Sequence, residues 1–245
     1  MSAAVDPEVA AVVARLQQRI DALPARLEHR RTFLETYLRI TGAVGEAVAA
    51  GTFEDSAWVR RWDVTFAGLF LAAHDADLAG GPVPRPWRLA FAADPALPPL
   101  VHVLVELNAH LNCDLPQALL AVLDDADLDA EPVVAARRRD HARIDAVLAA
   151  RTAAEGKRLN GRVTGRLLLP LNTWLTGRFL PRARTQAWHN VLTLAAARRQ
   201  DRPAYAGGLH DLDALSSAKV TELLDPRWVL PRVALRGFGV ALPAA

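Results

Sequence analysis

The chain has 245 residues, of which 51% are hydrophobic and 23% are charged, and its formal net charge is +2. This composition is typical of a globular protein and excludes a disordered, low-complexity chain. Basic residues alternate with acids except near 137–139 and 178–184, whereas non-specific nucleic-acid binding needs a basic stripe. We therefore expect no nucleic-acid partner.

Helical spacing and capping signals predict helices along the whole chain. We expect them at about 7–22, 25–50, 57–78, 87–92, from 99 onward, 115–123, 131–151, 167–180, 181–199 and 211–224. The pairs Arg202-Pro203 and Gly207-Gly208 predict a loop before the last helix. The predicted fold is all-α, a single irregular bundle of about nine to ten helices around a buried central helix. We expect one domain over residues 1–245, with a C-terminal segment from about residue 205 as the candidate for an appendage.

The sequence also predicts where the protein resides. Cys113 is the single cysteine, so an intramolecular disulfide is excluded. The N-terminal stretch has early acids and an amphipathic pattern, and it lacks the apolar core and cleavage site of a signal peptide. No run reaches the ~18 apolar residues that a bilayer span needs. We expect a cytoplasmic protein with no membrane span.

The central helix is predicted from PPLVHVLVELNAHLNCDLPQ (98–117), the most apolar run in the chain. A helix that is apolar nearly all round is buried, and its polar side chains need partners there. His102, Glu106 and His110 are one turn apart and share a face, whereas Asn108 faces away from them. This helix is therefore predicted either to anchor a polar network or to line a site.

Pro116 bears on how this helix ends. Proline has no N–H, and its ring would clash with the carbonyl of Asn112, so the helix should end or kink nearby. Asp114 followed by Gln117 has the pattern of an N-cap with its reciprocal partner for a next helix. Asp114 is therefore open to two interpretations, a helix cap or a site residue.

Several segments carry a resemblance to a known family. NAHLNCDLP (108–116), with VH upstream, resembles the NAHxNxDLP signature of an all-helical family of bacterial proteins of unknown function that is common in actinobacteria. RWDVTFAGLFLAA (61–73), PRPWRLAF (84–91), RRDHARIDAVL (138–148) and RTQAWHNVLTL (184–194) resemble its other segments in the same order. The resemblance implies a helical fold but no known reaction. It implies polar positions at Asp63, His102, Asn108, His110, Asn112, Asp114, Asp140, Trp188 and Asn190. The chain departs from the family pattern at Val101, Glu106, Leu107 and Asp145.

The expected function is that of an enzyme acting on a small, largely apolar metabolite in a polar-lined cavity. His110 would be an acid–base group or a ligand, with Asp114 and Asp63 as its partners. Asn108 and Asn112 would orient a carbonyl group. Further catalytic or binding candidates are His102, Asp140, Tyr37, Trp188 and Asn190.

Two other functions stay open. Histidine and carboxylate are common ligands of zinc and iron, so a metal-dependent hydrolase is one alternative and a transition metal the one cofactor considered. His102 and His110 are about 12 Å apart along a helix, too far for one ion, so acids of other helices would have to contribute. No HExxH, Walker, GxSxG or CxxC motif is present. A non-catalytic small-molecule-binding module is the second alternative, and the oligomeric state is not predicted.

Overall fold

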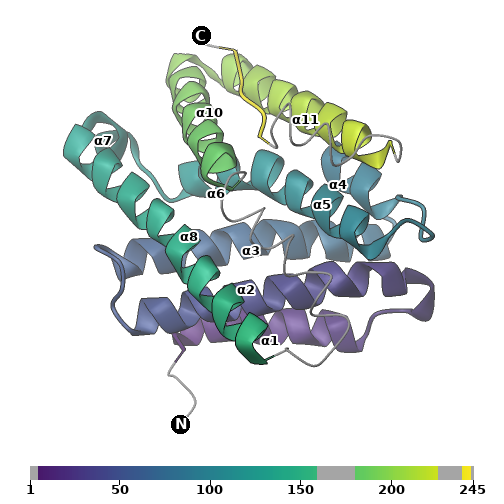
Figure 1. Ribbon diagram of the computed structural model, residues 1–245. Helices are drawn as coiled ribbons and strands as arrows, with labels where there is room; N and C mark the ends of the chain where they lie inside the picture. The colour runs from purple at the N-terminus through teal and green to yellow at the C-terminus, as the bar shows by residue number, and fades with distance from the viewer. Residues whose placement is uncertain (1–4, 159–179, 226–238, 244–245) are drawn as a thin grey trace.

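The computed structural model describes residues 5–158, 180–225 and 239–243, and within these ranges the chain is all-α with no strand (Figure 1). The predicted helical bundle is confirmed, and the helix predicted at 167–180 falls almost wholly outside the described residues. In chain order the elements are α1 (Pro7–Asp21), the 3₁₀ helix η1 (Ala25–Arg30), α2 (Arg31–Ala49), α3 (Ser56–Leu78), α4 (Arg85–Phe91), α5 (Pro99–Ala109), the π-helical turn η2 (His110–Asp114), α6 (Leu115–Ala121), α7 (Asp125–Asp129), α8 (Glu131–Arg158), α10 (Leu180–Gln200) and α11 (Arg202–Leu224).

Several helices begin at an aspartate, as the sequence signals predict. Asp6 accepts hydrogen bonds from the backbone N–H groups of Glu8 and Val9 at 3.0 and 3.3 Å, ahead of a proline in the first turn. Asp55 accepts the N–H of Trp58 at 2.9 Å and opens α3. Each carboxylate satisfies N–H groups that have no partner within the helix.

The loop predicted before the last helix is wrong, because α11 already begins at Arg202. Asp201 caps it by accepting the N–H of Ala204 at 2.7 Å, and Pro203 occupies the first turn, where its missing N–H costs nothing. Gly208 has a packing role: a Cβ added there would lie 2.9 Å from Leu194 Cδ2 of α10. This glycine therefore allows α10 and α11 to approach closely, and it does not interrupt the helix.

The helices form a layered bundle (Figure 1). Helices α1, α2 and α3 pack on one another, and α8 crosses α2. Helices α4, α5, α10 and α11 form the other side, and α11 packs against α4, α5 and α10. The largest fully buried side chains include Trp58, Phe70 and Trp87. Across the described ranges, no helix is both long and apolar enough to cross a membrane.

The buried central helix runs without interruption from Pro99 to Ala121 through α5, η2 and α6, which together are called the central rod below. The helix does not end near Pro116 but continues through the π-helical turn, in which the Leu115 N–H bonds to the His110 carbonyl five residues back. This wider turn passes the proline without a break. Asp114 makes no capping hydrogen bond to α6, so the cap interpretation of this residue is wrong.

Candidate functional site

The π-helical turn holds a buried histidine–aspartate pair. His110 Nδ1 lies 2.8 Å from Asp114 Oδ2, and the same oxygen accepts the Trp87 indole N–H at 2.8 Å. His110 and Asp114 are 1% and 3% exposed. Burial lowers the pKa of His110 and raises the pKa of Asp114, and the bond between the two groups opposes both shifts.

Aromatic rings enclose this pair. The His110 ring stacks on Phe66 with centroids 3.6 Å apart, and Tyr37 meets it edge-on at 4.8 Å. Asp63, one turn before Phe66 on α3, is also buried, and its Oδ2 has no hydrogen-bond partner among the described residues. Burial raises the pKa of Asp63 to about 7 and, with the nearby charges of Asp63 and Asp114, raises that of Tyr37. Asp63, Tyr37, His110 and Asp114 therefore belong to one polar cluster inside the core.

The other polar side chains of the central rod are buried as well. His102, Glu106 and His110 face the same side, towards η1, Arg30 and the aromatic residues of α2 and α3. Burial raises the pKa of Glu106 well above its usual range, with the charge of Arg30 opposing. Asn108 is fully buried. Neither of the two pockets described below is lined by His110.

Two asparagines of the predicted site contact the C-terminal segment 239–243. Asn190 donates to the Val240 carbonyl at 2.9 Å and accepts the Leu242 N–H at 2.8 Å. Asn112 accepts the Val240 N–H at 2.9 Å. Buried polar groups need hydrogen-bond partners, and here the amide side chains and the backbone groups of the segment supply them to each other. These contacts attach the end of the chain to α10 and η2.

Asp140 likewise serves the fold. Its two carboxylate oxygens accept the backbone N–H groups of Glu54 and Asp55 at 2.7 and 2.8 Å, just before α3. Its Oδ1 also pairs with Arg143 at 2.6 Å. These contacts connect α8 to the start of α3, and Asp140 is 0% exposed.

His102 lines a pocket of about 490 Å³ between η1, the start of α2 and the start of α5. Its ring lies against His29 with centroids 4.8 Å apart. Burial lowers the pKa of both rings, and the charge of His102 lowers the pKa of His29 further. The residues that line this pocket do not include His110.

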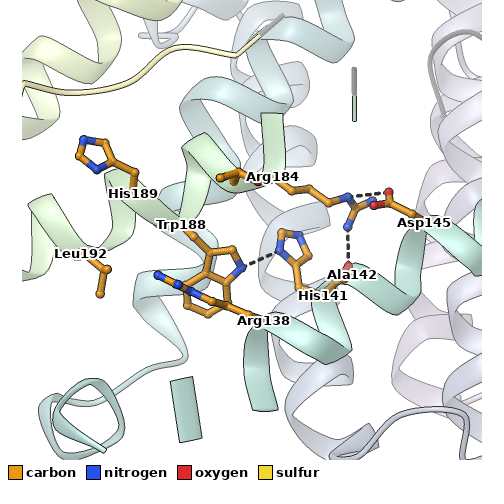
Figure 2. Close-up of a pocket in the computed structure, with 9 residues that line it drawn as sticks. Arg138, His141, Ala142, Asp145, Arg184, Trp188, His189 and Leu192 are labelled. Atoms are coloured by element: carbon orange, nitrogen blue, oxygen red, sulfur yellow. Dashed lines mark hydrogen bonds and ion pairs between the residues drawn. The ribbon is translucent and has the colours of Figure 1, made fainter. Parts of the chain in front are cut away.

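A second pocket, of about 450 Å³, lies between α8 and α10 (Figure 2). Residues spaced three and four apart on each helix supply its walls, which is the spacing of a single helix face. The α8 face contributes Arg138, His141, Ala142 and Asp145, and the α10 face contributes Arg184, Thr185, Trp188, His189 and Leu192. The volume is within the range of small-molecule sites.

His141 has a fixed tautomer in this pocket. The Trp188 indole N–H donates to His141 Nδ1 at 2.9 Å (Figure 2), so a neutral ring must carry its proton on Nε2. Burial, aided by the charge of Arg184, lowers the pKa of His141 well below its usual range. The residue is 2% exposed, and its Nε2 has no hydrogen-bond partner among the described residues. The ring is therefore neutral, with a buried Nε2–H that has no acceptor among the described residues.

Arg184 and Asp145 pair beside this histidine. Arg184 Nε lies 2.8 Å from Asp145 Oδ1, and its Nη1 donates to the His141 carbonyl at 2.9 Å (Figure 2). Burial raises the pKa of Asp145, although Arg184 opposes this shift. The Arg184 side chain is 9% exposed and that of Asp145 is 21% exposed. The carboxylate is thus the more accessible partner.

Sequence reasoning included Trp188 among the binding residues but did not single out His141. The segment RRDHARID has three arginines and two acids, which is typical of a solvated face. One signal was available: positions 138, 141, 142 and 145 share a helical face, as do 184, 188 and 192. Their pairing depends on how α8 and α10 meet, which no local pattern shows.

The metal alternative finds no matching geometry in the described part of the chain. Within residues 5–158, 180–225 and 239–243, no three histidine, cysteine, aspartate or glutamate side chains are grouped to hold an ion. A zinc or iron site needs at least three such ligands from the protein. These ranges therefore offer no donor set on which to base a metal-dependent hydrolase.

The chain belongs to a protein family described as a family of unknown function (DUF5995), whose model matches residues 9–226. The membership of a family of unknown function predicted from the sequence is thereby confirmed. No curated protein and no solved structure matches the chain.

Proposed function

We propose that this protein is an enzyme that moves a proton on a small carbonyl compound bound between α8 and α10. The observation that carries the proposal is the Trp188–His141 hydrogen bond in a pocket that also contains Asp145. The expected small-molecule enzyme is retained, but its reacting groups differ from the His110 cluster. Acid–base sites typically contain two titratable groups whose pKa values are shifted in opposite directions, as are those of His141 and Asp145.

The chemistry follows from the two protonation states. The Asp145 carboxylate takes a proton from the carbon beside the carbonyl, and the C–H electron pair moves to form an enolate. The enolate oxygen accepts a hydrogen bond from the neutral His141 Nε2–H, which stabilises the developing charge. Asp145 then returns the proton to the same or a neighbouring atom. A carboxylate with a raised pKa is a stronger base than an ordinary one at neutral pH.

The positions of the two catalytic candidates support a shared ligand, because both line the same pocket. Asp145 follows His141 by four residues, so the two side chains are neighbours on one face of α8. Arg184 contacts both residues, through the Asp145 carboxylate and the His141 carbonyl, and so fixes their relative positions. Trp188 holds the imidazole from the opposite helix. The site is therefore organised before any ligand binds, as electrostatic catalysis requires.

Deuterium exchange tests this proposal. The full chain is incubated in D₂O with a panel of 2-oxo acids and cyclic ketones, and NMR follows the C–H groups beside each carbonyl. We expect catalysed exchange in at least one compound, reduced roughly 100-fold or more by Asp145→Asn and by His141→Gln. His210→Gln, which changes an exposed histidine of α11, is the matched control and should be unaffected. Binding of these compounds without exchange would indicate a non-catalytic binding module.

A further inference from the structure

We infer that the ligand of the α8–α10 pocket carries one carboxylate, which Arg138 and Arg184 bind while its apolar part lies against Trp188 and Leu192. This inference rests on the proposed function for the location of the site, and it adds the chemical class of the ligand.

Arg138 differs from its neighbours on α8. Arg137 pairs with Asp55 at 2.7 Å, and Arg139 pairs with Glu54 at 2.8 Å. Arg138 has no carboxylate within ion-pair distance among the described residues. Its guanidinium instead lies over the Trp188 ring, 5.6 Å from the centroid, at the pocket wall (Figure 2). A cation held by an aromatic face keeps its N–H edges available for an anion.

Arg184 is a second, more deeply placed cation. A guanidinium carries five N–H donors in a fixed fork; in Arg184 the Nη1 group donates to the His141 carbonyl, and Nε lies within ion-pair distance of Asp145. Because its side chain is 9% exposed, a charge-assisted bond to a ligand forms with little competition from water. Arg184 is the anchor of the proposed carboxylate site, and Arg138 closes it.

The charge balance selects a monoanion. Among the described residues that line the pocket, the guanidinium groups of Arg138 and Arg184 are accompanied by a single carboxylate, that of Asp145, and the buried His141 ring is neutral. These described lining residues therefore carry one net positive charge. A carboxylate neutralises it, whereas a phosphate dianion would leave excess negative charge beside Asp145.

The apolar part of the ligand has its own wall. Leu192 lines this pocket and is 38% exposed. Few other large hydrophobic side chains are exposed in the described ranges. Trp188 contributes a ring beside Leu192. Covering this surface with a small apolar group adds affinity in proportion to the area removed from water.

Isothermal titration calorimetry of the full chain tests the inference, with sodium benzoate, neutral benzamide and inorganic phosphate as probes. Benzoate should bind at least tenfold more tightly than either of the others. Arg138→Ala should weaken benzoate binding roughly tenfold, whereas Arg139→Ala, an exposed neighbour paired with Glu54, should leave it unchanged. Arg184→Gln should abolish binding, and a thermal melt shows whether that variant is folded.

The outcomes separate the two proposals. Equal binding of benzoate and benzamide, tighter binding of phosphate, no benzoate binding, or equal effects of Arg138→Ala and Arg139→Ala would overturn the carboxylate inference. If deuterium exchange of neutral ketones persists in that case, the proposed function stands without it. The converse result is benzoate binding that depends on Arg138 while no compound of the panel undergoes exchange. This result would support the carboxylate site and contradict the proposed enzymatic function.

Discussion

The core cluster around His110 and the pocket around His141 use similar parts in different surroundings. Each contains a buried histidine and a tryptophan indole N–H, and in each the histidine Nε2 has no hydrogen-bond partner among the described residues. In the core, the indole and the imidazole share a carboxylate inside a cage of aromatic rings. In the pocket, the indole binds the imidazole directly, beside Arg184 and Asp145. The two histidines therefore differ in their surroundings more than in their burial, and on this difference we propose a role in stability for His110 and in chemistry for His141.

The largest expected effect is a loss of stability when the core cluster is changed. Asp114→Ala leaves the His110 and Trp87 donors buried without an acceptor, and we expect a loss of about 3–5 kcal/mol in the free energy of unfolding. Urea denaturation measures it, with the exposed Asp21→Ala as a control that should change stability by less than about 0.5 kcal/mol. A loss as small as that of the control would show that the pair does not hold the core together.

A second prediction concerns pH and Asp63. Burial raises the pKa of this carboxyl to about 7, whereas an unfolded aspartate has a pKa near ~3.9. Between these values the folded state binds the extra proton, so this group's contribution to stability is present at low pH and is lost as pH rises towards 7. Asp63→Asn removes this dependence.

The measurement is the difference in unfolding free energy between Asp63→Asn and the natural chain at several pH values. From pH 4 to pH 8 it should change in favour of the variant by on the order of 2–4 kcal/mol. A difference that stays constant across this range would contradict an ionisable group buried in the folded core.

The smallest stability effect is expected in the pocket. His141→Gln keeps an acceptor for the Trp188 indole N–H, so we expect a loss of about 1 kcal/mol or less. Urea denaturation of this variant beside Asp114→Ala compares the two regions directly. If His141→Gln costs as much as Asp114→Ala, both histidines are fold determinants and the distinction between the regions fails.

Much of the fold was predictable from local signals. Asp6 and Asp55 cap helices where the sequence predicts them, and the apolar run at 98–117 is the buried central helix. Gly208 was misjudged, since a glycine that permits close helix packing has the same local pattern as one in a loop. The π-helical turn was also missed, because passing Pro116 without a break depends on the tertiary packing around η2.

The candidate site was less predictable for a similar reason. The polar residues of the signature segment divide among the core cluster, the His102 pocket and the attachment of the C-terminal segment. Asn112, for example, meets Val240 only because the chain returns to the central rod after more than a hundred residues. His141 is in a segment whose charges suggest a solvent-exposed face, and its pocket exists only where α10 crosses α8.

The most direct test uses the two indole N–H groups as reporters. In ¹⁵N-labelled full-length protein, Trp87 reports on the core cluster and Trp188 on the pocket, since each donates to a group of its own region. During a titration with sodium benzoate, the Trp188 indole signal should shift progressively while the Trp87 signal stays in place. A shift of Trp87 with Trp188 unmoved, or no shift of either signal, would contradict the location of the ligand site between α8 and α10.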